Sequence, residues 1–174
     1  MSKHTRLFIL CGIILLAAMF RLIGTGLPNV SPVAAMALFG GAYLTDRKWA
    51  FILPISALLL SDWFLGFHET MWAVYLSFAA IVGIGMRVGR SKSPGSVVAG
   101  SLSGSVLFFV VTNFAVWLGS GYYPQDLGGL FLSYAMGVPF FHYTLLGDLL
   151  FNGVLFGGMA WLGARFPALA EARA

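Results

Sequence analysis

The most polar stretch in this otherwise apolar chain is SDWFLGFHET, residues 61–70. Its Asp62, His68 and Glu69 are residue types that exchange protons in catalysis or coordinate metal ions. A metal site is nevertheless not expected, because the chain contains no HxxxH, HExxH or CxxC spacing. A membrane enzyme would need two titratable groups that converge on one point. Asp62, His68 and Glu69 are the only candidates for such a pair, and no catalytic motif accompanies them, so the chain is not expected to be an enzyme.

Two aromatic residues in the same stretch, Trp63 and Phe67, offer a second kind of chemistry. Flat apolar rings can stack on a ring-containing ligand, and they can equally anchor a helix at the membrane interface. We expect both rings, together with Asp62 and His68, to contribute to a small-molecule site. In that site the carboxylate would recognise polar or cationic groups, while the rings stack on the solute.

A second polar group lies inside an apolar run. Thr144, Asp148 and Asn152 recur every four residues, which places them on one face of a helix. An ionisable side chain within a membrane costs about 2.5–3.5 kcal/mol on insertion scales, so this face is expected to turn toward the bundle interior or a cavity. Asn113, in the preceding run, also requires a polar partner. Two interpretations stay open: a ligand or ion-coupling site built on Asp148, or a polar clasp in which Asp148 pairs with Asn113 or a hydroxyl.

The composition indicates where the elements that hold these residues must lie. The 174-residue chain has 9% charged residues and a mean hydropathy of +0.89, whereas soluble domains carry about 25% charged residues. So few charges cannot cover a water-facing surface, and the chain is expected to be an integral membrane protein. It has no GxxxxGKS/T loop, no GxSxG motif and no basic patch with interleaved aromatics, so an NTPase, an acyl transferase and a nucleic-acid-binding protein are not expected.

Continuous apolar runs predict an all-α polytopic membrane bundle of about six transmembrane helices in a single domain, residues 1–174. The second and third runs are short for a span, so each must extend into polar flanks or be shielded by protein. An additional run, Leu127–Phe141, is interrupted by Gly137 and Pro139, and it predicts a separate helix that lies over, or re-enters, the outer face. The six predicted spans are residues 7–23, 31–44, 49–60 extending toward 67, 71–86, 97–118 and 143–162.

The basic residues predict the orientation in the membrane. With the N-terminus inside, nine of the ten Lys and Arg residues fall on the inner side and Arg21 alone lies toward the outside, which is the positive-inside pattern. Both termini are therefore expected on the cytoplasmic side. On this topology residues 24–32, 61–70 and 119–129 face outward, and Asn29 joins the polar groups of that side.

Pairs of glycines at four-residue spacing occur in the last two runs, as Gly100 with Gly104 and Gly153 with Gly157. Such spacing lets helix backbones approach closely within lipid. The close contact can be made within the chain or with a partner membrane protein, and both alternatives stay open.

Five segments carry a resemblance to known proteins: NVSPVAAMALFGGAYL (29–44), LPISALLLSDWFLGFH (53–68), TNFAVWL (112–118), YYP (122–124) and PFFHYTLLGDLLFNGVLFG (139–157). They resemble an uncharacterised bacterial family of small multi-spanning membrane proteins, labelled only as candidate transport proteins. The resemblance covers most of the chain and implies a location in the bacterial inner membrane.

More distantly, the chain is similar to the S-components of energy-coupling-factor vitamin transporters. That resemblance implies six helices, cytoplasmic termini, outer loops that close over a vitamin, and a docking contact between the first helix and an energising module. The chain departs from it in the first run, where Gly12, Ala17 and Ala18 form no clear pair of small residues. The nearest such spacing lies in the second run.

These patterns together predict a membrane transport protein that acts as the substrate-binding subunit for a small molecule, vitamin-like or metal-containing, near the extracytoplasmic face. Besides lipids and the solute, the expected partner is an energising transmembrane ATPase module, and no cofactor is expected. The alternatives are a proton- or cation-coupled carrier with Asp148 as its coupling group, and a structural or assembly protein with no solute. The expected site residues are Asn29, Asp62, Trp63, Phe67, His68, Asn113, Asp148 and Asn152.

Overall fold

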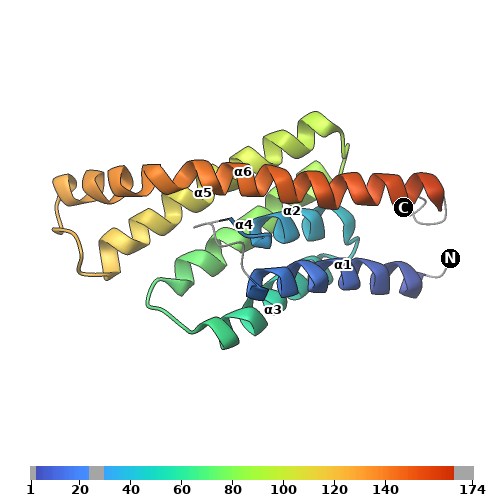
Figure 1. Ribbon diagram of the computed structural model, residues 1–174, viewed down its shortest axis with the longest axis horizontal. Helices are drawn as coiled ribbons and strands as arrows, with labels where there is room; N and C mark the ends of the chain where they lie inside the picture. Colours follow the sequence, from blue (N-terminus) through green and yellow to red (C-terminus); the bar gives the residue numbers. More distant parts are fainter. Residues whose placement is uncertain (1–2, 24–29, 167–174) are drawn as a thin grey trace.

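The computed structural model describes residues 3–23 and 30–166, and Figure 1 shows them as a bundle of helices. The predicted all-α class is confirmed, since the described residues form six helices and no strand. Four of these helices, α3 to α6, are long and apolar enough to cross a membrane. The helices are α1 (Lys3–Ile23), α2 (Val33–Tyr43), α3 (Arg47–Leu65), α4 (Met71–Val88), α5 (Pro94–Gly119) and α6 (Leu127–Arg165).

Side-chain caps fix where three of the helices begin. Asp46, Ser93 and Asp126 each accept a hydrogen bond from a backbone N–H of the first turn of α3, α5 and α6. Such caps satisfy donors that the helix itself leaves free. Gly66 ends α3 with a φ of 98°, a left-handed conformation that glycine adopts without strain. Residues 66–70 therefore form a turn rather than an extension of α3.

The prediction of a separate helix over residues 127–141 is wrong. The segment is the first part of α6, a 39-residue helix that continues through Pro139 and runs along the length of the molecule in Figure 1. Proline is tolerated inside membrane helices when neighbouring groups compensate for the missing hydrogen bond. Here Gly137 lies against Asn113 and Phe109 of α5, so the interrupted segment packs on a neighbouring helix instead of leaving the bundle.

α2 is the short helix at the centre of the bundle. It has 11 residues, nine of which are buried, and it contacts every other helix of the bundle. The expectation that a short apolar run must be shielded by protein therefore holds for α2. Phe39 of α2 packs edge-on against Phe156 of α6, with ring centroids 5.4 Å apart, and both rings belong to the main hydrophobic core.

Glycines bring α2 and α4 into direct backbone contact. A Cβ added to Gly41 would overlap the carbonyl oxygen of Val82, and a Cβ added to Gly85 would overlap that of Leu38. Small residues permit this approach, which raises the number of van der Waals contacts between two helices in lipid. The α2–α4 pair is consequently the tightest helix contact in the bundle.

The two predicted small-residue pairs have different environments. Gly100 and Gly104 of α5 lie against α4, where a Cβ at Gly100 would come within 2.6 Å of Val88 Cγ2. The α5 pair therefore serves packing within the chain. A Cβ added to Gly153 or Gly157 of α6 would meet no atom within 4 Å, and both of these glycines are exposed.

The alternating direction of the helices brings Arg21, Asp62 and Tyr75 together at one end of the bundle. The start of α1 and the end of α6 lie together at the opposite end in Figure 1. The last turns of α1 and α3 and the first turns of α4 lie near each other, because Arg21, Asp62 and Tyr75 are in contact. The polar stripe of α6 approaches the same region from the middle of its helix.

Candidate functional site

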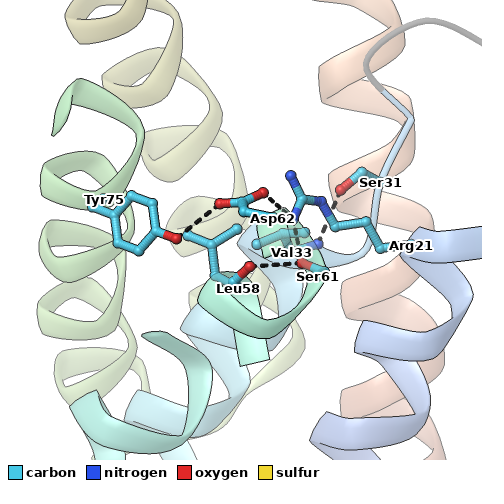
Figure 2. A network of polar contacts seen from close by, with 7 residues as sticks. All are labelled: Arg21, Ser31, Val33, Leu58, Ser61, Asp62 and Tyr75. Atoms are coloured by element: carbon cyan, nitrogen blue, oxygen red, sulfur yellow. Dashed lines mark hydrogen bonds and ion pairs between the residues drawn. The ribbon is translucent and has the colours of Figure 1, made fainter. Parts of the chain in front are cut away.

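Three helices meet at a buried ion pair, shown in Figure 2. The Arg21 guanidinium lies 2.6 Å from Asp62 Oδ1, and the Tyr75 hydroxyl donates a hydrogen bond of 2.8 Å to Asp62 Oδ2. Arg21 also donates to the hydroxyl of Ser61, which in turn donates to the carbonyl of Leu58. The side chains of Arg21 and Asp62 are 20% and 6% exposed, so the pair joins α1, α3 and α4 largely away from solvent.

The positions of these residues on their helices explain why they pair. Arg21 lies in the last turn of α1, where a positive charge is favourable to the helix dipole. Asp62 lies in the last turn of α3, where a negative charge is unfavourable. The guanidinium and the tyrosine hydroxyl together compensate for that position by neutralising the carboxylate and occupying both of its oxygens.

A second buried polar cluster joins α5 to α6. The Ser105 hydroxyl lies 2.6 Å from Asp148 Oδ2, and Asn152 Nδ2 donates a bond of 3.0 Å to Ser101 Oγ. Asp148 is 3% exposed. Asp148 therefore has a hydroxyl partner from the neighbouring helix, Ser105 rather than Asn113, and this contact is compatible with either interpretation of the acid. Thr144 is also buried, so the whole predicted stripe faces the bundle interior.

Asn152 is incompletely satisfied. Its Oδ1 is the one buried side-chain oxygen or nitrogen without a hydrogen-bond partner among the residues that the structure describes. An unpaired buried acceptor loses its hydration without compensation. Asn152 therefore keeps one free acceptor inside the bundle, one helical turn from Asp148 on the same face of α6.

A half-enclosed cavity of about 250 Å³ lies between the two polar clusters. Asp62 and Arg21 contribute to its lining from one cluster and Asp148 from the other. Val33, Ala34, Val74, Phe78 and Phe108 supply apolar lining, and Ser31, His68 and Thr144 complete it.

A neighbouring cavity of about 260 Å³ shares part of this lining. His68, Val74, Phe108 and Thr144 border both spaces. Asn113 borders the second cavity, where its Nδ2 donates to the carbonyl of Phe109 on its own helix. The two spaces therefore adjoin each other beside the turn that carries His68.

The structure brings together some of the predicted site residues. Asp62, His68 and Asp148 border the first cavity, although they come from α3, the following turn and α6. Asn113 borders the adjoining cavity and Asn152 lies deeper, beside Ser101. Asp62 is held by Arg21 and Tyr75, so its carboxylate is engaged within the protein.

Trp63 and Phe67 do not border these cavities. Their rings pack edge-on with centroids 6.3 Å apart, and the Trp63 side chain is 72% exposed. Of the two interpretations for these rings, this position favours interfacial anchoring over stacking on a solute. Asn29 lies outside the described residues.

Sequence reasoning missed Arg21 and Tyr75 as partners of Asp62. A signal for Arg21 was present, because it is the one basic residue placed on the outer side by the predicted topology. A lone cation near an outer acid within apolar surroundings requires a counter-ion. Tyr75 gave no comparable signal, since tyrosines are common near membrane interfaces.

The chemistry available at the cavity is that of hydrogen bonding, charge and aromatic contact. The part of the chain that the structure describes contains no group of three or more His, Cys, Asp or Glu residues close enough to hold a metal ion. The groups that border the cavity can bind and orient a small molecule.

Comparison with known proteins adds the family. No curated protein and no solved structure matches the chain. The sequence model of one family matches residues 1–169. The chain accordingly belongs to a family of unknown function, DUF6580.

Proposed function

We propose that this chain is a membrane transport protein whose role is to bind a small molecule in the 250 Å³ cavity. One observation carries the proposal: Arg21, Asp62, His68 and Asp148, which come from three distant parts of the sequence, border a single half-enclosed space. Ionisable side chains within membrane helices are expensive and commonly mark solute pathways. A cavity that gathers several of them at one end of a bundle is suited to solute binding.

The lining has the composition of a binding site. Such sites combine a mostly apolar wall with a few fixed polar groups, and they usually measure about 300–1,000 Å³. The cavity is slightly smaller, at about 250 Å³. An adjoining space of about 260 Å³ shares His68, Val74, Phe108 and Thr144 with it. A small solute is therefore the best fit.

The remaining parts of the proposal concern topology and energy. Nine of the ten basic residues support cytoplasmic termini, and on that orientation Asp62 and His68 of the cavity wall would lie toward the extracytoplasmic side of a bacterial inner membrane. Uptake would then need an energising ATPase module, as in the S-components that the chain distantly resembles. The exposed Gly153 and Gly157 of α6 offer one face where a partner helix could approach.

A proton- or cation-coupled carrier is the second candidate. It is favoured by the burial of Asp148 beside Ser105 without a basic partner among the described residues. In this candidate, proteoliposomes would accumulate solute in response to a pH gradient, and Asp148→Asn would abolish the accumulation. A wild-type protein that transports equally well without any ion gradient would argue against it.

Native mass spectrometry of the protein in mild detergent tests the primary proposal. We expect a stoichiometric small-molecule adduct on the wild-type protein and at least about tenfold weaker retention in Asp148→Ala, because the buried acid is lost from the cavity wall. Glu69→Gln is the matched control, since it removes an exposed acid near the same end and should leave the adduct unchanged.

Two outcomes would contradict the proposal. An Asp148→Ala variant that folds normally and keeps the adduct would remove the cavity from the assignment. A clean apo mass after incubation with vitamin and metal mixtures would favour a structural role, in which both polar clusters act as clasps.

A further inference from the structure

The charges around the cavity are unevenly compensated. Asp62 is neutralised by Arg21, and both of its oxygens have partners. Asp148 also borders the cavity, but the group that bonds to it is the uncharged hydroxyl of Ser105. With Asp148 ionised, this acid is not paired with any basic residue in the part of the chain that the structure describes. A buried carboxylate of this kind is costly until a cation reaches it.

Two aromatic rings line the same space. Phe78 and Phe108 lie with centroids 5.5 Å apart and planes tilted by 37°, and both border the cavity with Asp148. The face of an aromatic ring attracts cations through its quadrupole, most strongly where water is excluded. The rings and the acid therefore favour the same kind of ligand.

We propose that the solute is a small organic cation, an ammonium compound with an apolar body. This inference rests on the proposed function and specifies its substrate class. The ammonium group would pair with Asp148 and lie against the rings of Phe78 and Phe108, and the apolar body would contact the remaining apolar lining. A neutral analogue would gain the apolar contacts without satisfying the acid. An anion would be repelled by the carboxylate of Asp148. The guanidinium of Arg21 would not compensate for this repulsion, because it is already paired with Asp62.

The cavity limits the size of this cation. A volume of about 250 Å³ lies below the usual range of about 300–1,000 Å³ for ligand pockets, so the solute must be small. Benzylammonium, with one aromatic ring and one primary ammonium group, is small enough to be accommodated there. Benzyl alcohol and benzoate keep the ring and replace the cation with a neutral and an anionic group, so the three compounds form a matched series of probes.

The test measures dissociation constants of the three probes by isothermal titration calorimetry on the purified full chain. We expect benzylammonium to bind at least about tenfold more tightly than benzyl alcohol, and benzoate to bind most weakly. In Asp148→Asn, which keeps the size of the side chain and an acceptor for Ser105, the preference for the cation should disappear. In Glu69→Gln it should persist.

A second variant covers the case in which Asp148→Asn does not fold. Phe108→Leu keeps the apolar character but removes an aromatic face. It should weaken benzylammonium by about threefold more than benzyl alcohol, the range expected for one partly desolvated cation–π contact.

Several results would overturn the cation class. Equal binding of benzylammonium and benzyl alcohol would do so, as would tighter binding of benzoate or no binding of any probe. An equal loss of preference in Glu69→Gln would attribute it to the general field of the outer face. The proposed function is judged separately, because a neutral or anionic adduct that is lost in Asp148→Ala would uphold binding at this cavity and exclude the cation.

Discussion

Alanine at Gly85 is expected to destabilise the protein by about 3 kcal/mol, the upper end of the usual range for an overpacked core. The added methyl group would overlap the carbonyl oxygen of Leu38 on α2. That oxygen belongs to a helix backbone, so it cannot turn aside as a flexible side chain could. The two helices would have to separate, and α2 would lose contacts along its most closely packed face. Thermal unfolding in detergent, followed by circular dichroism, measures the effect.

Gly83→Ala is the matched control for this prediction. Gly83 is on the same helix, and a Cβ there would meet no atom within 4 Å. Alanine also has the higher helix propensity, so the control should be neutral or slightly stabilising. Similar midpoints for Gly83→Ala and Gly85→Ala would show that α2 and α4 are not in backbone contact.

The second large effect is expected at the ion pair. Replacing Arg21 by Met would leave Asp62 buried and negatively charged at the end of α3, and breaking a buried pair in this way costs about 3–5 kcal/mol. Since the Arg21 side chain is partly exposed, we expect a loss of about 3 kcal/mol, at the lower end of this range. The double variant Arg21→Met with Asp62→Asn removes both charges and keeps an acceptor for Tyr75, so it should recover most of the loss. Chemical denaturation of the purified variants measures both changes.

Arg87→Met is the control for the ion-pair variants. Arg87 also lies in the last turn of its helix but is exposed, so its replacement should change stability by no more than about 0.5 kcal/mol. If the double variant were as unstable as Arg21→Met alone, the packing of the arginine side chain, rather than the stranded charge, would explain the loss.

The helical class could be predicted because the apolar runs are nearly continuous. The prediction failed where glycine and proline were assumed to interrupt a helix. Gly137 and Pro139 indicated an interruption between residues 127–141 and the following span. The outcome depended on α5, where Asn113 and Phe109 pack against Gly137. Tertiary contacts of this kind are not visible in the apolar pattern of a single segment.

In the candidate site, too, local helix geometry could be predicted from the sequence and the contacts between helices could not. Four-residue spacing correctly placed Thr144, Asp148 and Asn152 on one inward face, because helix geometry alone determines that they share it. Their partners Ser101 and Ser105 could not be chosen from the sequence. Serines occur throughout these apolar runs, and the rotation of α5 against α6 determines which of them reach α6.

Trp63 illustrates how rotation also separates neighbours in the sequence. Consecutive residues on a helix differ by about 100° in direction. Since Asp62 points inward to Arg21, the adjacent Trp63 points away from the cavity, as its exposure indicates. Proximity in the stretch 61–70 therefore did not mean proximity in the site.

The shortness of α2 has a consequence for biogenesis. Its 11 residues extend about 16 Å, roughly half of a hydrocarbon layer about 30 Å thick. A helix of that length is too short to cross such a layer by itself. Its closest partner, α4, is synthesised later, and the glycine contacts between them require both helices. The contacts that hold α2 most closely can therefore form only after α4 has been synthesised.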